Sequence, residues 1–181
     1  MTLRVFVATF IFRGDAVLLL ERSRTARFAP ERWTGVGGRV EPDELNEVEA
    51  AALREIREET GLSGSDLRDL RVRFVLTLPE AGGISVLVFC AAETDRAGVG
   101  PCDEGTLHWV PVSDLHRVDM IDNARRALTA LIQDRKSGKA PEAVRYGVCR
   151  CDKSGKVVEW AALTPSADAS TPLPYTGEGK R

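Results

Sequence analysis

Hydrophobic and polar positions alternate, or run wholly apolar, in several short segments that turn residues separate. Such segments are rich in β-branched and aromatic side chains, which favours β-strands. A Gly14-Asp15 turn joins the first two, a stretch with Pro79 and two glycines joins a middle pair, and Asp152 to Gly155 joins the last pair. The pattern predicts extended segments at residues 3–12, 16–21, 35–40, 70–78, 84–92, 106–110, 144–151 and 156–161.

Two other segments repeat their apolar residues at helical spacing. The first, residues 46–60, is expected to place its apolar stripe on Leu45, Val48, Ala52, Leu53 and Ile56, and Gly61 ends it as a C-terminal cap. The second, residues 121–136, has Leu128, Leu131 and Ile132 on its inner face and is capped by Asp122 or Asn123. Strands interspersed with two amphipathic helices predict an α/β fold in which a mixed sheet lies between helices.

Length and composition place this pattern in one globular domain. The chain has 181 residues, of which 43% are hydrophobic and 29% charged, values ordinary for a folded enzyme. We expect the domain to span residues 1–164, because residues 165–181 are rich in Ser, Thr, Pro and Gly and resemble a flexible tail. The net charge of −2 argues against a protein that binds duplex nucleic acid, which normally presents a basic face.

The chain shows no sign of a membrane or secretory segment. Its first apolar run, residues 5–12, is too short to span a bilayer and lacks a small-residue cleavage site. The four cysteines have no zinc-ligand spacing and are expected to be free thiols, mostly buried, in a reducing cytoplasm. We therefore expect a cytoplasmic protein.

Three carboxylates gather on one edge of the first helix. At about 100° per residue, Glu59 falls within the apolar stripe, Glu55 about 40° beyond it and Glu58 roughly a further 60° around. Like charges at these spacings repel each other, so a cation that neutralises them would explain the arrangement. Carboxylate oxygens suit Mg²⁺ or Mn²⁺, which in turn bind phosphate oxygens. The alternative is a solvated acidic face paired with Arg54 and Arg57.

The residues around these carboxylates resemble the Nudix box, G-x5-E-x7-R-E-U-x-E-E-x-G-U, where U is a bulky aliphatic residue. The positions that match are Gly38, Glu44, Arg54, Glu55, Ile56, Glu58, Glu59, Gly61 and Leu62. Nine residues instead of seven separate Glu44 from Arg54, so the loop between them is two residues longer than the pattern. The resemblance implies the Nudix fold, an α/β/α sandwich.

The resemblance also implies roles for individual residues. Glu55, Glu58 and Glu59 would bind two or three divalent ions, and Glu55 or Glu59 would orient or deprotonate the attacking water. Arg54 would join the loop to the helix through a carboxylate. Gly37 and Gly38 would let the backbone approach the phosphates of a nucleoside diphosphate linked to a further group X.

Segments outside the box are similar to the oxidised purine nucleoside triphosphatases of this family. They are residues 27–38, which lead into the box, and residues 103–115, where Glu104 would be a remote metal ligand. The alternative for Glu104 is an ordinary acidic loop residue. Residues 119–123 occupy the place of base-reading acids, which align here as Asp122 and Asn123. Ile121 stands where the subfamily has an aromatic platform, and Thr34 where it has an asparagine.

Four arginines and two aromatic residues precede the glycines. Arg22, Arg24, Arg27 and Arg32 predict either a cationic wall for a triphosphate or a solvated loop. Phe28 or Trp33 is expected to stack on the base, the alternative being a place in the core, to which we assign Trp160.

Two classes of function follow. The first is a Mg²⁺-dependent hydrolase of a nucleoside triphosphate, with 8-oxo-dGTP as the leading substrate and ADP-ribose, dinucleoside polyphosphates or another NDP-X compound as alternatives. The second is a nucleotide-sensing module without turnover. The presence of all three helix glutamates favours the enzyme.

Overall fold

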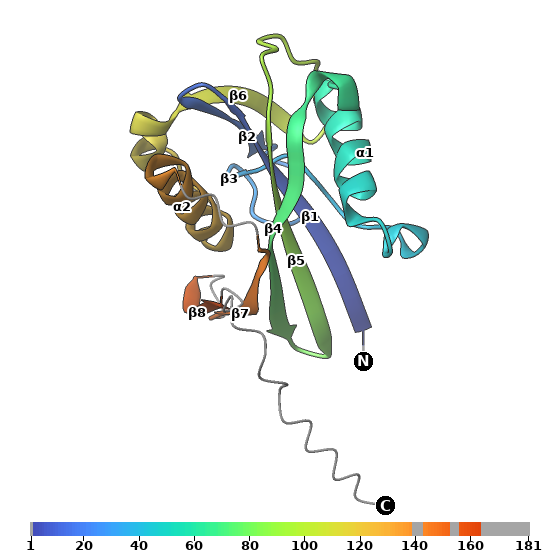
Figure 1. The fold of residues 1–181 in the computed structure, drawn as a ribbon. Coiled ribbons are helices and arrows are strands. Elements are labelled where there is room, and N and C mark those ends of the chain that lie inside the picture. The colour runs from blue at the N-terminus through green and yellow to red at the C-terminus, as the bar shows by residue number, and fades with distance from the viewer. Residues whose placement is uncertain (1, 139–142, 153–155, 164–181) are drawn as a thin grey trace, which may run out of the picture.

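The computed structural model describes residues 2–138, 143–152 and 156–163. In this part of the chain, strands β1 to β8 form one mixed sheet (Figure 1). The strands are Thr2–Arg13, Ala16–Arg22, Trp33–Thr34, Arg68–Glu80, Gly83–Glu93, Gly105–Pro111, Arg145–Cys151 and Val157–Leu163. The helices are α1, Val48–Thr60, and α2, Asp122–Ser137, with 3₁₀ turns η1, Pro42–Glu44, η2, Gly64–Asp66, and η3, Val112–Arg117.

The centre of the sheet is a parallel pair. Strand β1 runs alongside β5 in register from Thr2 opposite Gly83 to Phe12 opposite Glu93, and the strand order is β3-β2-β1-β5-β4-β7-β8, with β6 paired to β2. Strands β4 and β7 form a second parallel pair, whereas the remaining pairs are antiparallel. The predicted mixed sheet is therefore confirmed.

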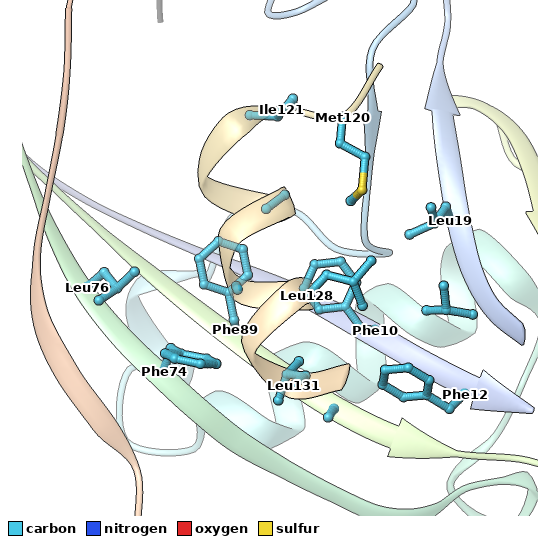
Figure 2. Close-up of a cluster of buried hydrophobic side chains, with 14 of the residues drawn as sticks. Phe10, Phe12, Leu19, Phe74, Leu76, Phe89, Met120, Ile121, Leu128 and Leu131 are labelled. Atoms are coloured by element: carbon cyan, nitrogen blue, oxygen red, sulfur yellow. The ribbon is translucent and has the colours of Figure 1, made fainter. Parts of the chain in front are cut away.

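The two helices cover opposite faces of this sheet, which is the Nudix fold of the α/β/α class (Figure 1). Helix α1 buries Ala51 and Ala52 against Val7, Val88 and Cys90. Helix α2 packs its apolar side on the other face. Figure 2 shows Leu128 and Leu131 lying over the aromatic rings of Phe10, Phe74 and Phe89. Each of these large side chains contributes about 1.5–3 kcal/mol to stability through burial, so the two clusters fix the relative position of the helices and sheet.

Most predicted elements are present, with ends shifted by at most two residues. One exception is Leu45, which was expected on the inner stripe of the first helix and is 46% exposed. The reason is that α1 begins only at Val48, after the 3₁₀ turn η1. Residues 35–40, which were predicted as an extended segment, form no regular strand; they run beside β1 through isolated bridges such as Thr9 with Val36, and the strand β3 lies just before them at Trp33–Thr34.

The cysteines and tryptophans can also be placed. All four cysteines are free, and Cys90 and Cys149 are buried. Trp160 packs against the α2-side cluster, with its ring centroid 6.1 Å from that of Phe74, as predicted. Among the described residues, no helix is both long enough and apolar enough to cross a membrane. The proposed tail, residues 165–181, lies outside the described residues.

Candidate active site

The two glycines of the box lie directly on strand β1. The N–H of Val7 donates a 2.9 Å hydrogen bond to the carbonyl of Gly38, and the Gly37 backbone has φ of +151°. A Cβ atom at Gly37 would lie only 2.1 Å from the carbonyl oxygen of Val7. This close approach requires glycine, since any side chain would push the loop off the strand.

Glu59 lies in the last turn of α1 and is buried, with 5% of its surface exposed. Its Oε2 accepts a 2.9 Å hydrogen bond from the N–H of Gly37, whereas its buried Oε1 has no hydrogen-bond partner. The pKa of Glu59 is raised to about 8, chiefly by burial. The hydrogen bond from the Gly37 N–H and the charge of Arg22 lower this pKa, whereas the carboxylates of Glu104 and Glu55 help to raise it. A cation beside Oε1 would favour the ionised form instead.

Arg54 links the loop before α1 to the carboxylates on the helix. Its Nε and Nη2 donate to the two oxygens of Glu44 at 2.7 and 2.9 Å, a bidentate pair. Its Nη1 donates to Glu55 at 2.9 Å and to Glu58 at 3.2 Å, and Nη2 also reaches the carbonyl of Arg39. The longer segment thus still delivers Glu44 to Arg54, because residues 45–47 form a short turn between η1 and the start of α1 at Val48.

Glu55 lies against the second glycine of the loop. A Cβ atom at Gly38 would come within 2.7 Å of Glu55 Oε1, so the glycine leaves the space that this carboxylate occupies. Burial raises the pKa of Glu55, while its hydrogen bond and charge interaction with Arg54 lower it and the charges of Glu58 and Glu104 raise it. Glu55, which is partly buried, and Glu59, which is buried, are therefore two carboxylates that face the same loop.

Glu104 reaches this site from the segment before β6. Its carbonyl accepts a 2.9 Å hydrogen bond from the N–H of Ser23, which fixes the segment to the end of β2. Its side chain is 53% exposed and lies 3.7 Å from Arg22 Nη1. Because its charge raises the pKa of both Glu55 and Glu59, it belongs to the same electrostatic site.

The donor set fits a hard divalent cation in its chemistry. It consists of carboxylate oxygens, and the unpartnered Glu59 Oε1 is the atom that most needs a positive partner. Within the described ranges, no three acidic, histidine or cysteine side chains already converge as a formed metal site. Glu58 explains part of this, because its side chain is 59% exposed and is paired with Arg54.

A cavity of about 460 Å³ opens on the α2 face of the sheet. The helix carboxylates do not line it themselves, but Glu55 and Glu59 contact Gly38 and Gly37, which do. Of the residues proposed from the sequence to bind substrate, five line it: Phe28, Thr34, Gly37, Gly38 and Asn123. Glu104 lines it as well, and Ile121 lies at its wall. Phe28 is 65% exposed at its rim, whereas Trp33 lies beside His108 with ring centroids 4.8 Å apart.

Two proposed substrate-binding residues lie elsewhere. Arg27 is exposed and is absent from the cavity lining. Asp122 is engaged in structure, because its Oδ1 lies 3.4 Å from Arg32 and its Oδ2 accepts a 3.2 Å hydrogen bond from the N–H of Val157. The expected position of Asp122 in the base site is therefore not observed, since strand β8 packs against it.

The predicted cationic wall is also dispersed. Arg24 pairs with Glu31 on the surface, and Arg32 binds the carbonyl of Met120 and the carboxylate of Asp119. Only Arg22 of the four arginines lines the cavity. Arg24 and Arg27 lie in the loop of residues 23–31, which has positive φ at Ala29 and Glu31, and Arg32 follows it.

The structure adds lining residues that the sequence pattern did not single out. They come from three adjacent strands: Arg4, Phe6, Leu78, Glu80, Ser85 and Leu87. Their common signal is alternation, because every second residue of β1, β4 and β5 faces the α2 side. These residues form one surface only because β1 pairs with β5, a strand about 80 residues further along the chain. The alternation within each single strand does not reveal this pairing.

Comparisons with known proteins agree with this geometry. The family model described as "NUDIX domain" matches residues 2–132. The crystal structure of a mutator MutT protein from Bacillus halodurans is similar with a TM-score of 0.66 at 16% identity, covering 88% of this chain and 97% of that chain. A MutT Nudix hydrolase from Burkholderia pseudomallei gives a TM-score of 0.59 at 26% identity, covering 71% and 98%. A bifunctional NMN adenylyltransferase/ADP ribose pyrophosphatase from Francisella tularensis gives 0.57 at 20% identity, covering 74% and 41%.

Proposed function

Because the chain belongs to the Nudix family, we propose that it is a Mg²⁺-dependent hydrolase of a nucleoside triphosphate. The leading substrate is an oxidised purine nucleotide such as 8-oxo-dGTP, and water attack between the α and β phosphates gives the monophosphate and pyrophosphate. The observation that carries the proposal is the buried, unpartnered Oε1 of Glu59, whose carboxylate is bound to Gly37 in the lining of a cavity of about 460 Å³.

Glu55, Glu58, Glu59 and Glu104 hold the divalent ion, Mg²⁺ or Mn²⁺, in this proposal. When bound, the ion screens the charge of the pyrophosphate and lowers the pKa of the attacking water. Glu59 or Glu55 orients this water and accepts its proton. Arg54 keeps Glu55 in place through the hydrogen bond of its Nη1, while Glu44 holds the other side of the guanidinium.

The phosphates and the base occupy successive parts of the cavity. Gly37 and Gly38 present backbone without side chains to the phosphates, and Arg22 supplies a positive charge at the same wall. Phe28, at the rim, stacks on the base, while Thr34 and Asn123 form polar contacts. Arg27 and Asp122, which the sequence placed here, have no direct role in this arrangement.

The proposal assigns the hydrolase activity to a domain of residues 1–164, whereas residues 165–181 lie outside the described part of the chain. The protein acts on a small-molecule nucleotide in the cytoplasm and binds neither duplex nucleic acid nor membranes, as expected from its charge of −2 and its short apolar runs.

A turnover assay on the full chain tests the activity. Release of phosphate or pyrophosphate is measured with Mg²⁺ and with EDTA for 8-oxo-dGTP, dGTP, dATP and ADP-ribose, and the products are identified. We expect hydrolysis only with Mg²⁺. Absence of Mg²⁺-dependent turnover with every nucleotide would favour a sensing module without catalysis.

The ranking of kcat/KM tests the substrate. We expect 8-oxo-dGTP to exceed dGTP by only about tenfold, the effect of one modest hydrogen bond. The Thr34 hydroxyl makes fewer hydrogen bonds than an amide, and Ile121 has no ring to stack. A wide margin for ADP-ribose would overturn the damaged-nucleotide proposal and leave the Nudix chemistry intact.

A further inference from the structure

The end of the cavity far from the helix glutamates has its own polar group of side chains. Arg4 of β1 forms a salt bridge with Glu80 Oε2 at the end of β4, and the Ser85 hydroxyl of β5 donates a 3.0 Å hydrogen bond to Glu80 Oε1. All three line the cavity. Ser85 is only 1% exposed, whereas the side chains of Arg4 and Glu80 are 44% and 31% exposed, so the group joins a buried hydroxyl to an ion pair that solvent and a ligand can reach.

The strand register sets the distance of this group from the phosphate side. Arg4 lies opposite Ser85, and Val7, three residues further along β1, binds the carbonyl of Gly38. Three residues of strand span about 10 Å. Between the two ends the cavity is lined by apolar side chains, among them Phe6, Leu78 and Leu87. A nucleotide with its phosphates at Gly38 thus brings its base over an apolar floor towards Glu80.

Glu80 keeps unused capacity to accept hydrogen bonds. An ionised carboxylate has about four acceptor sites on its two oxygens. Arg4 binds one oxygen and Ser85 the other, which leaves one further site on each oxygen. By contrast, Asp122 is already held by Arg32 and by the N–H of Val157. Glu80 is therefore the carboxylate placed to read a base in this cavity.

We propose that Glu80 is a specificity-determining residue that accepts hydrogen bonds from the N1–H and the 2-amino group of a guanine-type base, with Ser85 and Arg4 as positioning residues. Two adjacent donors match two adjacent carboxylate oxygens. Adenine presents an acceptor, N1, at the corresponding place and is disfavoured, because a carboxylate has no proton to donate to it. The inference rests on the proposed function only in taking the ligand to be a nucleotide.

Equilibrium binding of reaction products tests this assignment without requiring turnover. Calorimetry with the full chain compares dGMP, dIMP and dAMP, where dIMP lacks the 2-amino group. We expect dGMP to bind at least tenfold more tightly than dAMP, with dIMP between them, since hydrogen bonds to a charged group contribute about tenfold to hundredfold in affinity.

The variant Glu80→Gln provides the decisive comparison. Its amide can donate to adenine N1 and accept from the 6-amino group, so the ratio of dGMP to dAMP affinity is expected to fall at least tenfold while dAMP binding does not weaken. The variant Ser85→Ala is expected to lower the ratio by a smaller factor. The matched control is Glu93→Gln, which breaks a comparable contact with Arg135 of α2 outside this cavity and is expected to leave the ratio unchanged.

Three results would overturn the inference. One is an unchanged ratio in Glu80→Gln, and another is equal loss of dGMP and dAMP binding together with a lower melting temperature, which would indicate a purely structural salt bridge. The third is a Glu80→Gln effect on GMP but not on dGMP, because the carboxylate would then bind the ribose diol. If the protein hydrolyses nucleotides but the ratio of dGMP to dAMP affinity does not depend on Glu80, only this inference is wrong. If Glu80 sets that ratio but no nucleotide is hydrolysed, only the proposed function is wrong.

Discussion

The N–H of Gly37 donates a 2.9 Å hydrogen bond to the carboxylate of Glu59, 22 residues further along the chain. This contact joins the loop that lies on β1 to the last turn of α1. It uses one carboxylate oxygen for structure and leaves the other, Oε1, buried without a partner. The same side chain thus fixes the loop geometry and supplies a ligand atom for a cation.

Replacing Glu59 with Gln separates these two roles. The amide oxygen can still accept the Gly37 hydrogen bond, so the fold and melting temperature are expected to persist. The negative charge is lost, and we expect kcat to fall by about a hundredfold or more, because the cation and the attacking water lose their carboxylate. Steady-state kinetics with Mg²⁺ measure the change.

The control for this substitution is Glu49→Gln, an exposed position in the first turn of the same helix. It removes the same charge away from the site and is expected to leave kcat within about twofold, since surface substitutions away from a site have small effects. Turnover close to wild type in Glu55→Gln, Glu58→Gln and Glu59→Gln alike would rule out the assigned site.

Divalent cations are expected to stabilise the folded protein. The buried carboxylates are drawn together only in the native state, so Mg²⁺ binds the folded chain better than the unfolded one. At a hundredfold excess over Kd this contributes about 2.7 kcal/mol. Thermal melts with increasing Mg²⁺, matched in ionic strength with NaCl, should show a rising Tm that Glu59→Gln reduces. An unchanged Tm at every Mg²⁺ concentration would argue against a common site.

Much of the fold could be predicted because the relevant signals are local. Apolar alternation located β1 to within one residue at each end, and the glycine cap located the end of α1 at Thr60. The box carboxylates could be found for the same reason, since their spacing on one helix determines which edge they share. Arg54 was expected to join loop and helix through a carboxylate, and Glu44 is that carboxylate.

The rest depended on contacts between distant segments. Asp122 lies at the expected end of α2, but its carboxylate accepts a hydrogen bond from the N–H of Val157 in strand β8. Of the arginines before the glycines, Arg24 pairs with Glu31 and Arg32 with Asp119, contacts that no apolar pattern indicates. Glu80 and Ser85 meet Arg4 only because β5 pairs with β1, a long-range register that the individual strands do not encode.

A side chain at residue 38 is expected to displace the carboxylate of Glu55, which lies against Gly38. A Cβ atom at residue 38 would lie 2.7 Å from Glu55 Oε1, so in Gly38→Ala the carboxylate must move and weaken its hydrogen bond to Arg54. The side-chain end is flexible, so stability is expected to change little. Displacement of a catalytic group by about 1 Å can cost on the order of a hundredfold in rate, and we expect kcat to fall at least tenfold.

The matched control is Gly98→Ala, because a Cβ atom there meets no other atom within 4 Å. Kinetics and melts on the two variants should show a loss of activity confined to Gly38→Ala. Equal activity of both variants would mean that the position of Glu55 does not limit the reaction. A large drop in Tm for Gly38→Ala would assign the glycine to folding instead.

The pair of Glu44 and Arg54 predicts a specific dependence of stability on acid. Hydrogen bonds from Arg54 and from the N–H of Glu41 lower the pKa of Glu44 from 4.5 to about 2. A group whose pKa is lower in the folded state binds fewer protons there than in the unfolded chain. Its contribution is therefore complete above about pH 4.5 and is lost as the pH falls towards 2.

Glu44→Gln removes this contribution at every pH. We expect the variant to be less stable than wild type at neutral pH, and the difference should shrink as the pH falls from about 5 to about 2. Urea unfolding in EDTA across this range measures it without interference from bound cations. Glu31→Gln, which breaks the exposed pair with Arg24, is expected to change stability little at any pH. If the difference in stability between Glu44→Gln and wild type stays constant down to pH 2, the contact with Arg54 does not lower the pKa of Glu44. The ion pair would then not be what stabilises the attachment of the loop to α1.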